Sequence, residues 1–385
     1  MTPGKKAMDA NQLVMLATGD LIFDSPEADS LAALVEPTLA AGDVVVGHLE
    51  VLFTSRGARQ FMEVPAPPCD PKHMRAVAAA HFNVVTLAGN HVWDSGEPGI
   101  EDTRELLKQH GILFTGAGMS LEEARRPAVM ERKGTRIGFL SYNCIGPRES
   151  WATPAKPGCA YVNVLTHYEP AHVTPGSPAA IYTFPEPESL NAMKEDIRNL
   201  RPECDILVVA LHKGIVHTPI RLDMYEQPVS YAAIDAGADL VLGTHAHIMK
   251  GIEVYKGKFI FHGMGNFITV TKALTEASNF NLARWIERRK KLFGFEPDPD
   301  YPTFPFHPEA KQTIIAKCVI EDKKIVRVSA IPCWVNKKGQ PEVLRNDDRA
   351  KQVFEYMEKI TREAGLNARF ERDGDEIVVS PCNDR

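Results

Sequence analysis

Two histidines one residue apart, His245 and His247, directly follow an apolar run in the stretch DLVLGTHAH. Residues i and i+2 of an extended segment point to the same side, so both imidazoles are expected to face one cleft. Imidazole is the commonest metal ligand among protein side chains. The pair therefore suggests a metal site, although a single pair of this kind is as often structural.

An apolar run followed by a potential metal ligand recurs along the chain. Further runs end in the motifs ATGD, GHLE, GNHVWD, ALHKG and HGMGNF. Carboxylate, amide and imidazole groups without a thiolate are typical of a site for a divalent metal with nitrogen and oxygen ligands. Each residue alone also fits a turn, a helix cap or a buried polar position. Their coincidence favours a metal centre that contains Asp20, His48, Glu50, Asn90, His91, Asp94 and His212.

Short runs rich in valine, isoleucine and leucine alternate with amphipathic stretches of helical period. Strands that are apolar on both faces indicate a sheet covered on both sides, so we expect an α/β fold with α/β/β/α layers. Ligands of such sheets bind outside the carboxyl ends of the strands, which would gather the polar residues at one edge. The expected strands are residues 13–18, 43–49, 82–89, 136–142, 205–211, 239–244 and 258–263, with an antiparallel hairpin at 314–332.

One domain is expected over residues 1–335, with irregular insertions at about 144–188 and 276–312. Both insertions are rich in proline, and their aromatic residues favour ordered lids over linkers. Residues 336–385 show a helical pattern and then two short strands around Asp373 and Gly374. We expect this segment to pack on the same domain.

The amino-acid composition of the chain argues against some classes of binding partner. A hydrophobic content of 44% and a charged content of 24% are those of a soluble globular protein. The formal charge of −6 argues against a nucleic-acid partner, which needs a basic surface. No apolar run approaches the roughly 20 residues that cross a bilayer, so no membrane anchor is expected. The 7 cysteines are scattered and odd in number, which fits reduced thiols and a cytoplasmic location.

The order of the motifs resembles the CapA family, named for a poly-γ-glutamate capsule protein, within the calcineurin-like metallophosphoesterase superfamily. The resemblance implies a four-layer α/β/β/α sandwich with a centre for one or two divalent ions (Mn, Zn, Fe or Ca) at one edge. The matching pieces are TGD (18–20), HLE (48–50), GNHVWDSG (89–96), LHKG (211–214) and GTHAHIMKGIEVYKGKFIFHGMGNF (243–267).

The resemblance also implies roles for the metal ligands. Asp20 and His247 would bind one ion, and Glu50 would bridge to a second ion. The remaining ligands, Asn90, His212 and His245, would complete the coordination of that second ion.

Catalytic roles follow from the same resemblance. His91 would act beside the ions as an acid, a base or a stabiliser of developing negative charge, and Asp94 would orient it. Ile22 stands where the superfamily has a histidine, so one usual ligand is absent. Three further histidines near the predicted edge, His48, His217 and His262, suggest chemistry that diverges from that of the family. We expect His48 and His217 to be catalytic.

The leading hypothesis is a metal-dependent hydrolase in which metal-activated water attacks a small or peptide-like anionic substrate. The bond broken would be an amide, such as a γ-glutamyl link, or a phosphoester. A second hypothesis is an epimerase or lyase in which histidine and aspartate pairs shuttle a proton. A third is a non-catalytic subunit of capsule polymer synthesis.

Overall fold

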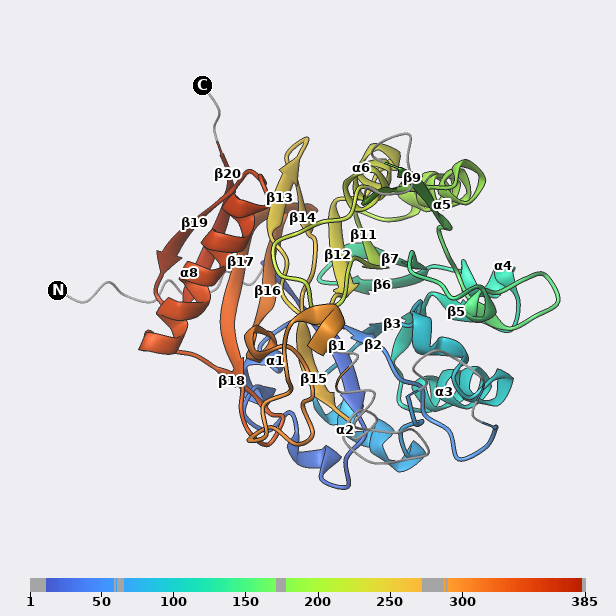
Figure 1. The fold of residues 1–385 in the computed structure, drawn as a ribbon, viewed down its shortest axis with the longest axis horizontal. Coiled ribbons are helices and arrows are strands. Elements are labelled where there is room, and N and C mark those ends of the chain that lie inside the picture. The colour runs from blue at the N-terminus through green and yellow to red at the C-terminus, as the bar shows by residue number, and fades with distance from the viewer. Residues whose placement is uncertain are drawn as a thin grey trace.

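Two large sheets form the centre of the molecule (Figure 1). The computed structural model describes residues 12–58, 60, 66–170, 178–271, 287 and 290–382. The first sheet has the order β19 (Ala368–Asp373), β20 (Glu376–Pro381), β17 (Lys324–Val335), β16 (Gln312–Glu321), β1 (Leu13–Phe23), β2 (Val44–Leu49), β3 (Val84–Thr86) and β4 (Leu113–Thr115), with β15 (Asn266–Val270) beside β1 and β18 (Pro341–Val343) beside β17.

The second sheet is mostly parallel and antiparallel only at its two edges. Its order is β13 (Ile252–Tyr255), β14 (Lys258–Phe261), β12 (Leu240–His245), β11 (Ile206–Lys213), β7 (Thr135–Asn143) and β6 (Ala128–Arg132). Two small ribbons accompany the sheets: β5 (Ala117–Gly118) with β8 (Gly158–Cys159), and β9 (Val164–Pro170) with β10 (Ala179–Pro185).

Helices cover the outer faces of the sheets. The α-helices are α1 (Glu36–Leu39), α2 (Met74–Ala79), α3 (Glu97–Gln109), α4 (Leu121–Ala124), α5 (Pro187–Leu200), α6 (Glu226–Ala236) and α8 (Asp348–Glu363). The 3-10 helices are η1 (Ala28–Ser30), η2 (Pro71–His73), η3 (Asn90–Trp93), η4 (Arg148–Ser150), η5 (Arg201–Glu203) and η6 (Pro308–Lys311). Among the described helices, no segment is both long and apolar enough to cross a bilayer.

The apolar residues of the sheets alternate between cores, and this alternation defines the layers. In β1, Leu13 and Met15 face a core shared with β7, β11 and β12, whereas Leu16 faces a core shared with α2 and α3. In β11, Val208 joins the core between the sheets, and Val209 joins a third core with α5 and α6. Three cores separate four layers, which confirms the predicted α/β/β/α class.

Strand β1 is longer than predicted. Residues 13–17 pair antiparallel with β16, and residues 20–23 pair parallel with β15. Asp20 therefore lies inside the strand, at a shift in register, and the prediction that it follows the strand's end is wrong. The apolar residues after Asp20 continue the strand because they are buried. At the change of partner a Cβ on Gly19 would lie 1.8 Å from the carbonyl oxygen of Gly265, so glycine is required there.

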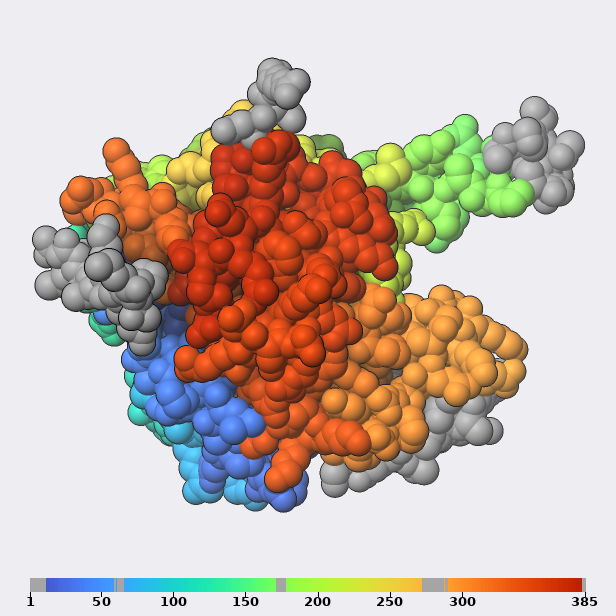
Figure 2. Space-filling view, turned by 90° about the vertical axis from the view of Figure 1, so that its left-hand side faces the viewer, coloured from blue at the N-terminus to red at the C-terminus, as the bar shows by residue number. Residues whose placement is uncertain are grey.

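The insertion at 144–188 is more regular than expected. Its residues 164–170 and 179–185 pair as β9 and β10, and Figure 2 shows this ribbon projecting from the body of the molecule. Alternating β-branched and aromatic residues explain the strands. Of the second insertion, 276–286, 288 and 289 lie outside the described residues. Its remainder supplies a small aromatic core of Tyr301, Phe304 and Phe306.

The C-terminal segment completes the first sheet and the core between the sheets. β20 pairs with β17, and β19 pairs with β20. Helix α8 is amphipathic, and its residues Val353, Met357 and Ile360 are buried in the core between the sheets. The helix therefore closes one side of the sandwich.

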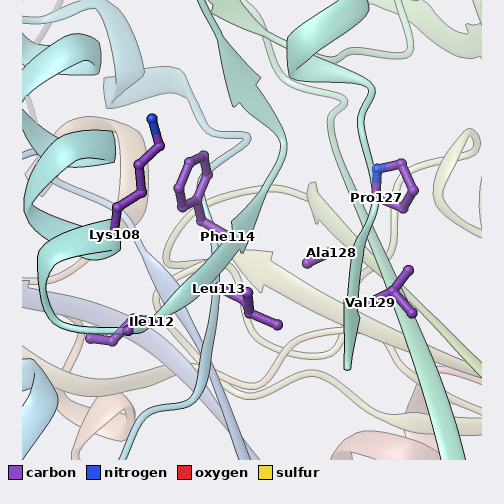
Figure 3. Close-up of a pocket in the computed structure, with 8 residues that line it drawn as sticks. Lys108, Ile112, Leu113, Phe114, Pro127, Ala128 and Val129 are labelled. Atoms are coloured by element: carbon purple, nitrogen blue, oxygen red, sulfur yellow. The ribbon is translucent and has the colours of Figure 1, made fainter. Parts of the chain in front are cut away.

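A cavity of about 460 Å³ opens between the edge strands β4 and β6 (Figure 3). Its lining is mainly aliphatic, with Phe114 and the stem of Lys108 on one side and Pro127 on the other. All of its lining residues fall between 108 and 129. The cavity is thus built from a part of the chain separate from the predicted site.

Candidate metal centre

The predicted metal ligands come together between the two sheets. β1, the end of β2 and the start of η3 supply Asp20, Glu50 and Asn90 from the first sheet. β11, β12 and the turn after β12 supply the histidines from the second sheet. The relative exposures are 0% for Asp20, 2% for Glu50, 1% for His212, 7% for His245 and 9% for His247.

Three overlapping groups of side chains present ligand atoms that all lie within 4.8 Å of one another. Two of the groups share Glu50, and two share Asp20. Glu50 lies between the pair Asp20 and His247 and the pair His212 and His245, where it could serve both. The groups are Asp20, Glu50 and His247; Glu50, His212 and His245; and Asp20, His48 and His212.

His247 lies between two carboxylates. Its Nε2 is 3.2 Å from Oε1 of Glu50, and its Nδ1 is 3.6 Å from Oδ2 of Asp20. The Nδ1 atom also lies 2.8 Å from Oδ1 of Asn266. Asn266 faces Asp20 directly in the β1–β15 pairing, so the strand register sets the position of the ring.

His212 holds the second part of the centre together. Its Nε2 lies 2.7 Å from Oδ1 of Asn90 and 3.2 Å from Nδ1 of His245. Its Nδ1 lies 3.0 Å from the hydroxyl of Thr244 on the neighbouring strand. Contacts of this kind fix the tautomer and the orientation of a ligand imidazole.

The segment that carries His245 and His247 is not extended. Both residues have positive φ angles, of 84° and 54° respectively. The prediction that the two rings share a side through strand alternation is therefore wrong. A tight turn brings them together, with ring centroids 6.1 Å apart. Positive φ is uncommon for a residue with a side chain, and such residues occur in tight turns and cluster at functional sites.

Burial keeps most of these imidazoles neutral. It lowers the pKa of His48 to about 4 and that of His245 to about 3, and it lowers the pKa of His212 well below its ordinary value. Neutral imidazole is the form that binds a metal. Burial, together with the nearby charge of Glu50, raises the pKa of Asp20 well above its ordinary value. The carboxylates thus repel one another in the absence of a cation.

The pKa values of His247 and Glu50 are determined more by the attraction between the two groups than by their burial. Burial acts to lower the pKa of His247, but Glu50 raises that pKa to about 9. Burial likewise acts to raise the pKa of Glu50, but His247 lowers it to about 2. A protonated His247 therefore offsets the carboxylate charge, and a divalent cation bound there would displace that proton.

The centre contains buried polar atoms whose hydrogen-bonding capacity is unused. Within the described residues, Nε2 of His48 and Oε2 of Glu50 make no hydrogen bond, and Oε1 of Glu50 is engaged by His247. An unsatisfied buried polar atom costs about 1–3 kcal/mol and calls for an explanation such as an ion or water. The nitrogen and oxygen donors present fit a divalent metal of the Mn, Fe or Zn type.

His91 and Asp94 form a pair at η3. Nδ1 of His91 lies 2.6 Å from Oδ2 of Asp94, and the same oxygen accepts a hydrogen bond from the backbone N–H of Ala66 at 2.7 Å. Burial acts to lower the pKa of His91, but the contact with Asp94 outweighs it and raises that pKa. The ring of His91 thus has its Nδ1 directed towards Asp94.

His217 lies against the centre without joining the three ligand groups. Its ring stacks on His247 at a centroid distance of 5.6 Å, and it meets Phe293 and Phe295 edge-on at 5.2 Å. Phe306 lies 4.8 Å from the ring of His247. The aromatic insertion therefore covers His247 and His217, which places His217 between the cover and the centre.

His262 belongs to a different cluster. Its Nδ1 lies 2.8 Å from Nζ of Lys213, and its Nε2 lies 2.9 Å from Oε2 of Glu253. Lys213 is fully buried and forms an ion pair with Glu226 at 3.0 Å. This network holds β11, α6 and β13 together behind His212.

Sequence reasoning missed the residues that orient the ligands. Thr86 contacts His48, Thr244 contacts His212, and Lys213 anchors the strand that carries His212. Thr244 stands directly before His245 in GTHAH, so its place beside the ligands had a sequence signal. Thr86 had none, because its contact with His48 depends on the pairing of β2 with β3.

Comparison with known proteins places this arrangement in a family. The family model described as bacterial capsule synthesis protein PGA_cap matches residues 14–271, which include every predicted metal ligand. The chain belongs to this family. The resemblance predicted from the motifs is confirmed.

Curated relatives of this PGA_cap family chain are distant in sequence. The PGA biosynthesis protein CapA of Bacillus subtilis is 25% identical over 336 residues, which cover 85% of this chain and 80% of that protein. The capsule biosynthesis protein CapA of Bacillus anthracis is 25% identical over 68% of this chain and 61% of its own length. A probable polyglutamine synthesis accessory protein of Mycobacterium tuberculosis is 28% identical, and the match spans 59% of it.

Solved structures also align with this PGA_cap family chain at low sequence identity. A hypothetical protein from Thermus thermophilus aligns with a TM-score of 0.45 and 15% identity, covering 83% of this chain and 98% of its own. The calcineurin-like phosphoesterase YfkN from Bacillus subtilis aligns with a TM-score of 0.39 and 12% identity, covering 92% and 97% of the two chains.

Proposed function

We propose that this protein is a metal-dependent hydrolase. The observation that carries the proposal is the convergence of buried carboxylates and imidazoles from both sheets into overlapping groups that share Glu50. Glu50 groups with Asp20 and His247 on one side and with His212 and His245 on the other, so it would contribute to both of two ions. The proposed ligands of the first ion are Asp20, Glu50 and His247, and those of the second are Glu50, Asn90, His212 and His245.

In the proposed reaction, residues of the chain transfer the proton and exclude water, while activation of the attacking water depends on the metal. When bound, divalent ions at such a centre lower the pKa of water and polarise the oxygen of the scissile group. His91 donates a proton to the leaving group, with Asp94 holding the ring and stabilising its charged form. Phe306 and the residues around it keep bulk water away from His247 and thereby strengthen the electrostatic interactions inside the site.

The proposed substrate is an anionic, peptide-like molecule with a γ-glutamyl amide bond. The names of two curated relatives refer to PGA biosynthesis and polyglutamine synthesis, and these names favour an amide bond in a glutamate or glutamine polymer over a phosphoester. A centre with two ions can act on either bond, so the phosphoester is the alternative substrate.

The first test measures metal content and hydrolysis together. Wild-type protein and His245→Ala are incubated with Mn²⁺ or Zn²⁺, desalted and analysed by plasma mass spectrometry. Each is then assayed for release of free amine from poly-γ-glutamate and of p-nitrophenol from a phosphoester. The proposal predicts close to two ions in the wild type, a loss of at least one in the variant, and amide cleavage that needs the metal.

Two outcomes would overturn the proposal. If the assay is run in D₂O and deuterium enters the α-carbon of glutamate without cleavage, the centre catalyses proton transfer instead of hydrolysis. If the wild type binds no metal, the proposed hydrolase activity is wrong, and a non-catalytic role in polymer synthesis takes its place.

A further inference from the structure

His48 is an imidazole of the centre for which hydrolysis as proposed above has no role. It lies in β2, directly opposite Asp20 in the pairing of β1 with β2. It is 2% exposed, so its ring is removed from solvent. The side chain is therefore placed by the sheet itself, on the same side of the sandwich as the ligands.

The ring of His48 is held with one nitrogen towards the centre. Nδ1 lies 3.0 Å from the hydroxyl of Thr86 on the neighbouring strand. With Nδ1 engaged, Nε2 points away from Thr86, and it makes no hydrogen bond to any described residue. The ring packs on His212 with centroids 4.5 Å apart.

Ligand atoms of Asp20, His48 and His212 lie within 4.8 Å of one another. The space in front of the two imidazoles is kept open by Gly89. A Cβ on Gly89 would lie 3.1 Å from Nε2 of His48 and 3.5 Å from Nε2 of His212. The backbone of Gly89 is extended, with φ −154°, so its conformation does not require glycine. Glycine is therefore needed at this position to leave space beside the two imidazoles.

We infer that His48 is a further ligand of the second ion, binding through Nε2 beside His212, with Asp20 of the first ion facing it. The inference rests on the proposed metal centre and assigns His48 to the metal instead of to acid–base catalysis. A neutral imidazole nitrogen next to a carboxylate suits a borderline divalent cation better than Mg²⁺ or Ca²⁺, which prefer oxygen ligands. The structure thus favours Zn²⁺, Fe²⁺ or Mn²⁺ at this position.

A second buried histidine shows what distinguishes His48. His73 is 6% exposed, its Nδ1 lies 3.1 Å from the carbonyl oxygen of Phe23, and its Nε2 also makes no hydrogen bond to a described residue. Yet His73 belongs to none of the ligand groups found in the described residues. It is therefore a matched control for the loss of a buried imidazole.

The test is a titration with Co²⁺ alone, followed by visible absorption, on wild type, His48→Ala and His73→Ala. Visible bands of Co²⁺ report the number and type of its ligands independently of any catalysis. We expect His48→Ala to weaken binding of one Co²⁺ at least tenfold and to change its spectrum. We expect His73→Ala to match the wild type.

Two further variants keep the test decisive if His48→Ala does not fold. His48→Gln fills the same space without an imidazole, and we expect the same spectral change. Gly89→Ala keeps both imidazoles but places a methyl group in front of Nε2 of His48 and of His212, and we expect it to weaken Co²⁺ binding as well.

The outcomes separate this inference from the proposed function. If wild type binds no Co²⁺, the metal centre itself fails. If wild type binds Co²⁺ and His212→Ala loses it, while His48→Ala and His48→Gln keep the wild-type affinity and spectrum, the role of His48 is wrong and the metal centre stands.

Discussion

In the proposed mechanism, Asp94 acts only through its contact with His91. Asp94 is 4% exposed, and its Oδ2 is committed both to His91 and to the backbone N–H of Ala66. It therefore cannot reach a substrate, and its effect must pass through the ring of His91. Such a partner typically changes activity by 10–100-fold when it is removed.

Replacing Asp94 with asparagine tests this role. An amide keeps the size of the side chain and can still accept from the backbone N–H of Ala66, but it carries no charge to stabilise a protonated His91. We expect kcat for the proposed hydrolysis to fall about 10–100-fold, with the metal content unchanged. A kcat within twofold of the wild type would show that His91 does not need Asp94.

At the scale of elements, the C-terminal hairpin is attached to the first sheet by a partly buried charge. Glu376 of β20 forms an ion pair with Lys317 of β16 and accepts a hydrogen bond from Ser329 of β17 at 2.8 Å. Burial acts to raise the pKa of Glu376, but these partners lower it below the ordinary value of 4.5. The carboxylate therefore stabilises the folded state only when it is ionised.

The sign of the pH dependence follows from that lowered pKa. Above pH 4.5 the stabilisation by Glu376 is fully present, and it is lost as the pH falls through the folded-state pKa. We expect Glu376→Gln to cost about 1 kcal/mol in urea unfolding at pH 7 and much less at pH 3. Glu371→Gln, on the exposed side of β19, is the control. An equal loss at both pH values would contradict the assignment.

Local patterns predicted the elements better than the turns between them. Apolar runs located several central strands of both sheets, and the motifs near their ends contain the residues that converge between the sheets. The turn at His245 and His247 was not predicted, because positive φ at a histidine is imposed by packing and has no local signature. The extension of β1 past Asp20 was missed for a similar reason, since its partner β15 lies far away in the sequence.

At the scale of the whole molecule, the centre joins the two sheets. Asp20 and Glu50 come from the first sheet, whereas His212, His245 and His247 come from the second. A cation held by both sets would bind the folded state and not the unfolded chain, so it would stabilise the packing of one sheet on the other. Ligand at a hundredfold excess over Kd contributes about 2.7 kcal/mol of stability.

Removal of metal should therefore lower the melting temperature of the whole protein. We expect chelation of the metal-loaded wild type to lower Tm by roughly 3 °C, because a chain of 385 residues has a large entropy of unfolding. His245→Ala should start from a lower Tm and respond little to the chelator. Calorimetry of both proteins with and without chelator makes the comparison, and an equal response of the two would argue against a shared ion.

The pairing of β1 with β15 also determines when the first strand can complete its pairing during synthesis. Residues 20–23 need residues 266–270 as their parallel neighbour, and these emerge from the ribosome about 250 residues later. At roughly 5–20 residues per second, Asp20 waits on the order of 12–50 s for its strand partner. An unfinished chain thus carries the early carboxylates without the late histidines. The order of translation would therefore delay capture of an ion by the proposed centre until His245 and His247 have been made.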